Sequence, residues 1–174
     1  MSKAVLISIR PKWCELIASG KKTIEVRKTR PKLETPFKCY IYCTKGEPLI
    51  YCRPSQQIGN GKVIGEFVCD RIFPITVEQN SPFSEERGGG YSESYSAEGF
   101  HDCLSDEEFD SYLDGESGFG LHISKLKIYN EPKKLSEFKR LDPTYDFSIP
   151  GEVCRTFSIN RPPQSWCYVK EIES

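Results

Sequence analysis

The sequence predicts an α+β fold in which a mixed, partly closed β-barrel is flanked by helices. Segments with strand patterning outnumber helical segments, and they follow one another through loops or single helices. The 174 residues are 37% hydrophobic and 28% charged, and no internal repeat divides them. That length and composition are typical of one globular domain, so we expect a single domain over residues 1–174.

The N-terminal part is expected to form a strand, a helix and a second strand. Residues 3–9 (KAVLISI) are apolar and rich in strand-forming side chains. Pro11 favours the first turn of a helix, the apolar residues after it recur at helical spacing, and Gly20 stands just past the last turn. Residues 23–27 (TIEVR) alternate between polar and apolar side chains, which predicts a strand.

Strand patterning returns in five later segments: 38–44, 62–75, 119–129, 153–159 and 165–171. We expect the last two to pair with each other through the connection NRPPQ. A helix is predicted over 104–115, where Ser105 and Glu108 form a capping box.

Two segments are predicted to be loops. Residues 46–61 are expected to form a long loop or hairpin excursion. Residues 76–100 are rich in Ser, Gly and Glu and lack periodicity, which predicts a loop insertion or a lid over a site.

The eight cysteines indicate free thiols rather than disulfides or a metal site. No CxxC pair occurs and the two histidines are not spaced for zinc, so no metal and no cofactor are expected. No apolar run reaches the length of a membrane span and the N-terminus lacks signal-peptide features, so we expect a cytoplasmic protein that does not contact a membrane.

The charges are distributed unevenly along the chain. Residues 1–73 carry a net charge of +8 and residues 74–174 a net charge of −9. A basic half would attract phosphate while the acidic half repels it, which would confine a polyanion to one face. Alternatively, the two halves attract each other in the fold.

The strand at 23–27 carries the main candidate site. Because side chains alternate along a strand, Thr23, Glu25 and Arg27 point to one side while Ile24 and Val26 point to the core. The polar row therefore faces either solvent or a cleft.

Two other segments offer side chains that can converge on this row. Lys22 precedes the strand, and the turn at 8–11 brings Ser8 and Arg10 to the end of the first strand. Residues 164–166 add a hydrogen-bonding and aromatic set: Gln164, Ser165 and Trp166. The indole of Trp166 either stacks on a base or packs in the core. For Trp13, in the first helix, the pattern favours the core.

Residues 10–27 (RPKWCELIASGKKTIEVR) resemble the ASCH domain family, whose motif is Gly-x-Lys-x-x-Glu-x-Arg. The motif is matched by Gly20, Lys22, Glu25 and Arg27. The segments LHISKLKIYNEPKKLSEF and PPQSWCYV also resemble small prokaryotic and phage members. The resemblance implies a fold related to the PUA domain and a cleft, lined by the motif, that binds RNA or a nucleotide.

One branch of the family is similar to amidohydrolases that deacetylate acetylated cytidine with a Lys, a Thr nucleophile and a Glu. In that branch the nucleophile occupies the position of Glu25, and a carboxylate is a poor substitute for an activated hydroxyl. Thr23 is the nearby hydroxyl on this strand.

Three functions therefore remain as hypotheses. The favoured one is a module that binds RNA or a modified nucleotide through Ser8, Arg10, Lys22, Glu25, Arg27, Gln164, Ser165 and Trp166. The second is a hydrolase of a nucleoside amide or of RNA, in which Lys22 and Glu25 form an acid/base pair helped by Thr23 or Ser8. The third is a protein-interaction or regulatory domain. The sequence does not fix the oligomeric state.

Overall fold

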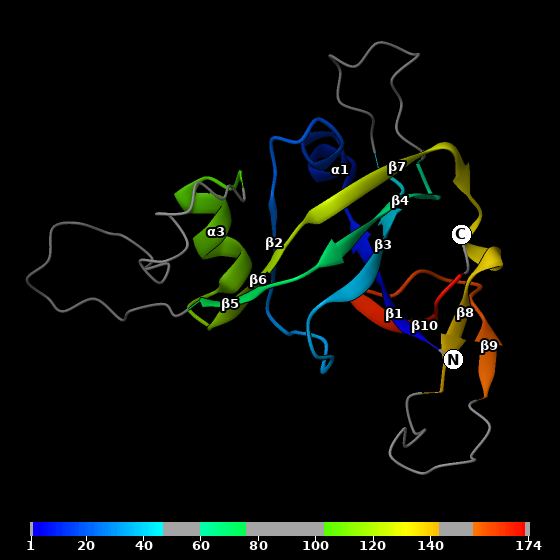
Figure 1. Ribbon diagram of the computed structural model, residues 1–174. Helices are drawn as coiled ribbons and strands as arrows, with labels where there is room; N and C mark the ends of the chain where they lie inside the picture. Colours follow the sequence, from blue (N-terminus) through cyan, green and yellow to red (C-terminus); the bar gives the residue numbers. More distant parts are fainter. Residues whose placement is uncertain (1, 47–59, 76–102, 143–154, 173–174) are drawn as a thin grey trace, which may run out of the picture.

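The computed structural model describes residues 2–46, 60–75, 103–142 and 155–172, which form two β-sheets and two α-helices (Figure 1). The larger sheet has seven strands in the order β7-β4-β3-β1-β10-β8-β9, and the smaller has the order β2-β6-β5. The strands are β1 (Lys3–Ile9), β2 (Ile24–Arg27), β3 (Phe37–Cys43), β4 (Val63–Cys69), β5 (Ile72–Ile75), β6 (Gly118–His122), β7 (Ser124–Lys133), β8 (Lys139–Leu141), β9 (Thr156–Ser158) and β10 (Trp166–Lys170). The helices are α1 (Pro11–Ala18), α3 (Asp106–Leu113) and a 3-10 turn, η2 (Leu135–Glu137).

The centre of the larger sheet is β1, which is parallel to β3 and antiparallel to β10. Val5 and Ile7 belong to one core cluster, whereas Ala4 and Leu6 belong to another on the opposite face. Burial on both faces explains why residues 3–9 are apolar almost without interruption. The predicted first strand is confirmed.

The smaller sheet packs against α3. Ile24 and Val26 of β2 share a core cluster with Phe109 and Leu113 of α3. The predicted capping box is present, since the Ser105 side chain accepts from the backbone N–H of Glu108 and the Glu108 carboxylate accepts from the backbone N–H of Ser105. The predicted helix over 104–115 is therefore confirmed in its core.

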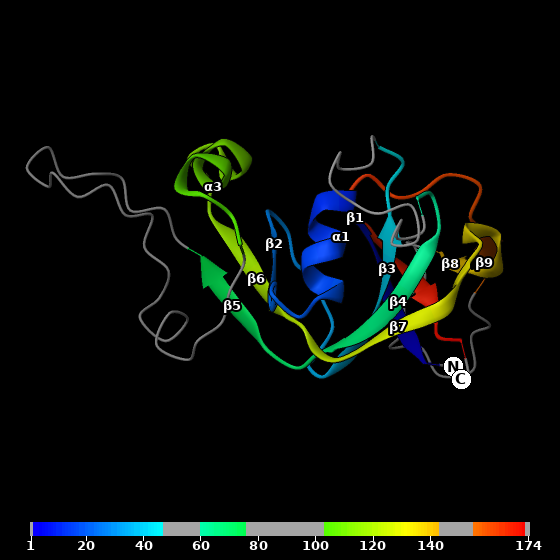
Figure 2. The ribbon, with the colours of Figure 1, turned by 90° about the horizontal axis from the view of Figure 1, so that it is seen from above.

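Two segments that were each expected to be one strand are bent into two. Residues 62–75 divide into β4 and β5, and residues 119–129 divide between β6 and β7. Figure 2 shows β4 and β7 side by side in the larger sheet; the chain continues from β4 into β5 and enters β7 from β6, and β5 and β6 pair in the smaller sheet. The bend is held by the ring of His122, whose Nδ1 lies 2.6 Å from Asp70, and by the His122 N–H, which donates to the Arg71 carbonyl. Alternation continues through such a bend, so the pattern alone does not reveal it.

The expected pairing of the last two strands is wrong. Strand β8 lies between β9 and β10, with Val169 opposite Arg140 and Lys139 opposite Ser158. Three residues with one apolar side chain are too few for an alternation signal, which explains why β8 was missed. Pairing among the described strands gives two sheets rather than one closed cylinder, so the expected barrel is not confirmed.

The six described cysteines are free, and all except Cys103 are buried, as expected. Burial raises the pKa of Cys39, raises that of Cys69 to about 12 and raises that of Cys167 to about 11. These thiols stay neutral near pH 7 and behave as core side chains rather than nucleophiles. The remaining two cysteines, and the loop predicted at 76–100, lie outside the described residues.

None of the described helices has the length and apolar character needed to cross a membrane.

Candidate functional site

A cleft of about 770 Å³ opens where the two sheets, both α-helices and the segment before β10 meet. Its wall on one side is α1 and the end of β1. On the other side are β2 and α3. Four of the expected site residues from outside the Lys-Glu-Arg motif line this cleft: Ser8, Arg10, Gln164 and Ser165.

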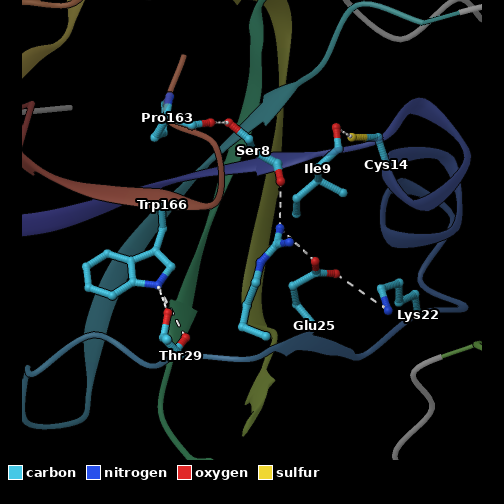
Figure 3. Close-up of polar contacts among 9 residues, drawn as sticks. Ser8, Ile9, Cys14, Lys22, Glu25, Thr29, Pro163 and Trp166 are labelled. Carbon is cyan, nitrogen blue, oxygen red and sulfur yellow. Dashed lines mark hydrogen bonds and ion pairs between the residues drawn. The ribbon is translucent and has the colours of Figure 1, made fainter. Parts of the chain in front are cut away.

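The floor of the cleft is formed by Lys22, Glu25 and Arg27, which we call the charged floor. The three residues are only 3%, 4% and 8% exposed. The Nη2 of Arg27 lies 2.9 Å from Oε1 of Glu25, and the Nζ of Lys22 lies 3.5 Å from Oε2 of the same carboxylate (Figure 3). One buried carboxylate thus pairs with two buried cations, which leaves a net charge of +1.

Local structure places these side chains. Helix α1 ends at Ala18, and two residues later Gly20 has a φ of 73°, a conformation that glycine adopts without a Cβ clash. The backbone N–H of Lys22 still donates to the carbonyl of Leu16, so Lys22 stays against the helix end. In β2, Ile24 and Val26 enter the core beneath α3, and alternation turns Glu25 and Arg27 into the cleft. Glu25 and Arg27 of the polar row therefore face a cleft and not solvent.

Arg27 joins the smaller sheet to the larger one. Its Nη2 donates to the carbonyl of Ser8, at 2.6 Å, in addition to its ion pair with Glu25. The hydroxyl of Ser8 in turn donates to the Pro163 carbonyl at 2.7 Å, and the Ser8 N–H donates to the Ser165 carbonyl at 2.9 Å. The end of β1, β2 and the segment before β10 are thereby held as one frame (Figure 3).

Two buried atoms of the charged floor have no hydrogen-bond partner among the described residues. They are Oε2 of Glu25, an acceptor, and Nε of Arg27, a donor. Buried polar groups are nearly always hydrogen-bonded, and an unpaired one typically costs about 1–3 kcal/mol. Open polar atoms at the floor of a cleft are the arrangement that a polar ligand would complete.

The rim of the cleft carries aromatic and basic side chains. Trp13 and Tyr112 line it from α1 and α3, and Arg10 and Lys28 are exposed beside it. The Nζ of Lys22 lies 5.2 Å from the centre of the Trp13 ring, within cation–π distance. Sequence reasoning assigned Trp13 to the core and gave no role to Tyr112. The position of Trp13 two residues after the helix start, beside the motif, was the available signal.

Two predicted site residues lie elsewhere. Thr23 is not among the described residues that line the cleft, and its carbonyl accepts from the backbone N–H of Ile123. Trp166 is likewise absent from that lining. Its indole N–H lies 3.2 Å from both the carbonyl and the hydroxyl of Thr29, and its ring packs edge-to-face on Tyr168 (Figure 3). Trp166 supports the wall of the cleft from behind.

An ion pair between Lys12 and Glu108 connects α1 to α3 at the rim. Hydrogen bonds from Lys12 and from the Ser105 backbone N–H hold the pKa of Glu108 below its ordinary value. A carboxylate whose pKa is lower in the folded than in the unfolded state adds stability at pH values above its unfolded pKa. That contribution is lost as the pH falls through the folded pKa.

We therefore expect Glu108→Gln to lower the free energy of unfolding slightly at pH 7 and to have less effect at pH 3. The change is small because both partners are well exposed. Urea unfolding of both proteins at the two pH values measures it. Glu107→Gln is the control, since Glu107 is exposed in the same first turn and shares its helix-end electrostatics. Equal losses for the two variants would contradict a specific role for the Lys12 pair.

No group of three or more His, Cys, Asp or Glu side chains that could hold a metal ion occurs within the described part of the chain.

Fold and site together define a small α+β domain with a buried Lys-Glu-Arg cluster at the floor of an open cleft. The chain belongs to the ASCH domain family, because the model of that domain matches residues 7–131. The match includes all of the charged floor, and it confirms the family resemblance seen in the sequence.

Solved structures with the same fold come from Zymomonas mobilis. The ASCH protein of that organism is 21% identical with a TM-score of 0.58, over 97% of this chain and 88% of that chain. Two single-residue mutants of it give 20% and 21% identity at the same TM-score; they cover 97% and 98% of this chain and 89% and 92% of theirs. At this identity the likeness establishes the fold. No curated protein matches the sequence.

Proposed function

We propose that the protein binds single-stranded RNA or a modified nucleotide in this cleft. The observation that carries the proposal is the charged floor of buried Lys22, Glu25 and Arg27, in which one atom of Glu25 and one of Arg27 have no hydrogen-bond partner among the described residues. The ASCH family resemblance supports the same class of ligand, since the floor consists of the residues of the family motif.

The charge of the cleft favours an anionic ligand of limited length. Four cationic side chains line it against two carboxylates, and one of these carboxylates, Glu108, is already paired with Lys12. An excess of cations attracts phosphate, but so few contacts are too few for tight binding along a duplex. A single nucleotide or a short single strand fits both observations.

Arg10→Ala combined with Lys28→Ala is expected to weaken binding of a short single-stranded RNA by about tenfold at low salt. Both side chains are exposed at the rim, so their loss removes attraction for phosphate without leaving a buried group unpaired. Fluorescence anisotropy with a labelled RNA oligomer measures the affinity as a function of salt.

The matched control is Lys127→Ala combined with Lys170→Ala, which removes two exposed positive charges that do not line the cleft. We expect less than about a twofold change for it by the same electrostatic argument. Equal weakening in the two double variants would mean that RNA binds by overall charge and not in the cleft. If the unmodified protein binds neither RNA nor any nucleotide, the proposal is refuted.

A hydrolase is the second candidate, supported by the ion pair between Lys22 and Glu25, which could move a proton. The helper hydroxyls give it less support, because the Ser8 hydroxyl donates to Pro163 and Thr23 is outside the described lining. Incubation with acylated cytidine and with labelled RNA tests this candidate. Turnover above that of Lys22→Ala would favour it over simple binding. A protein-interaction role would be favoured if neither binding nor turnover is detected.

A further inference from the structure

We propose that the charged floor reads the hydrogen-bonding edge of one nucleobase, with the base stacked on Trp13 and its phosphate held outside by Arg10 and Lys28. This inference rests on the proposed function and specifies how the ligand is oriented. The alternative orientation places the phosphate on the floor.

The floor is unsuited to a phosphate because of Glu25. Its carboxylate is 4% exposed and lies between the two cations, 2.9 Å from Arg27 Nη2 and 3.5 Å from Lys22 Nζ. A phosphate close to either cation would also be close to this negative charge, in surroundings where repulsion is poorly screened. Arg27 Nη2 is in addition already engaged by the Ser8 carbonyl. The floor cannot offer the forked pair of free donors that arginine presents to phosphate.

The open atoms of the floor match the edge of a base. Oε2 of Glu25 has the Lys22 ammonium 3.5 Å away but accepts no hydrogen bond, so it can accept one from a ligand, and a phosphodiester has no donor. Bases do present N–H groups, and carboxylates accept from the exocyclic amine of cytosine. Nε of Arg27 is an open donor, which complements the ring nitrogens and carbonyls of the same base edges. Both side chains are at least nine-tenths buried, so the site is built before the ligand arrives.

Trp13 is placed to stack on such a base. It lines the cleft from α1 and packs only partly against the core. The Nζ atoms of Lys12 and Lys22 lie 4.3 Å and 5.2 Å from the centre of its ring, so a stacked base would contact the ring beside these cations. Stacking of a base on an aromatic ring contributes about 1–3 kcal/mol. Arg10 and Lys28 also line the cleft, but unlike the residues of the charged floor they are exposed. A phosphate bound to them would stay hydrated.

The test compares ligands that share a phosphate and differ in the base. Binding of the four nucleoside monophosphates and of ribose 5-phosphate is measured by calorimetry. The best-bound nucleotide is then compared with its analogue in which methyl groups replace every N–H of the base edge. We expect ribose 5-phosphate to bind at least about 100-fold more weakly, and the methylated analogue at least about tenfold more weakly, because it leaves the Glu25 acceptor unpaired.

The role of Glu25 is tested by the ratio of the affinity for the nucleotide to the affinity for its methylated analogue, measured in the unmodified protein and in the variant. In Glu25→Gln the difference between the nucleotide and its methylated analogue is expected to shrink to within about threefold, because the charge-assisted hydrogen bond is lost. A merely structural Glu25 would weaken both ligands equally and leave the ratio unchanged. Trp13→Leu is expected to weaken every nucleotide by about tenfold. Phe157→Leu, at an exposed aromatic residue on β9, is the control with no change.

Ribose 5-phosphate binding as tightly as the nucleotides would overturn the inference and leave the proposed function standing. An unchanged affinity for the methylated analogue would also overturn it, and this comparison uses the unmodified protein, so it holds even if Glu25→Gln fails to fold. If neither RNA nor any nucleotide binds, the inference and the proposed function both fail.

Discussion

Replacing Glu25 with alanine is expected to lower the free energy of unfolding by about 3–5 kcal/mol. Glu25 is the shared partner of Lys22 and Arg27, and all three side chains are buried. Without the carboxylate, two positive charges would remain in a region with little solvent to stabilise them. Breaking a buried ion pair from one side is costly for this reason, even where the intact pair itself contributes little.

Urea unfolding monitored by circular dichroism measures the loss, provided that the slope with denaturant stays constant. The matched control is Glu116→Ala. Glu116 also pairs with a lysine, Lys28, at 3.5 Å, but its side chain is 69% exposed. We expect that variant to lose no more than about 1 kcal/mol. Similar losses in the two proteins would mean that solvent reaches the charged floor and that Glu25 is not a buried partner.

Replacing the whole charged floor with apolar side chains is expected to separate stability from function. The triple variant Lys22→Met, Glu25→Leu, Arg27→Met should be more stable than Glu25→Ala, because no unpaired charge is left in the interior. The triple variant still loses the hydrogen bond from Arg27 to the Ser8 carbonyl, and leaving that carbonyl unpaired costs about 1–3 kcal/mol of stability. The same variant should lose at least about 100-fold in affinity for single-stranded RNA, since the polar floor is gone.

The matched control for the triple variant is made at a second ion pair, in which Lys38 lies 2.9 Å from Glu171. Lys38→Met combined with Glu171→Leu removes a partly buried pair that does not line the cleft. Its affinity for RNA should be unchanged. Normal RNA binding by the triple variant would show instead that the Lys-Glu-Arg cluster is a structural ion pair, and that any ligand binds elsewhere.

Local patterns in the sequence predicted the elements that carry the site. Alternation over 23–27 separated Ile24 and Val26 from Glu25 and Arg27. In the structure Ile24 and Val26 join a core cluster with α3 and Glu25 and Arg27 line the cleft, which Val26 also borders. The capping box of Ser105 and Glu108 fixed the start of α3. Such features depend on neighbours within a few residues, so they can be read without knowing the fold.

Whether the polar side chains of β2 face solvent or a cleft was decided only by the tertiary structure. Solvent and a cleft were equally compatible with the pattern, because alternation says which side chains share a face and not what lies opposite. The opposite wall comes from the end of β1 and from α1, and α3, about eighty positions further along the chain, adds Glu108 and Tyr112 to the rim. Their long-range packing leaves no local signal.

Trp13 and Trp166 also show the difference between what the sequence predicts and what the tertiary structure decides. Helical spacing favoured the core for Trp13, whereas for Trp166 the sequence left both stacking on a base and packing in the core open. In the structure both rings pack partly against the core, and Trp13 also lines the cleft, while the indole N–H of Trp166 donates to Thr29, which lies 137 positions away in the sequence. The sequence by itself determined the strand, its two faces and the motif residues. Only the tertiary structure decided that these residues lie buried at the floor of a cleft, because that depends on segments that meet through folding rather than through proximity in the chain.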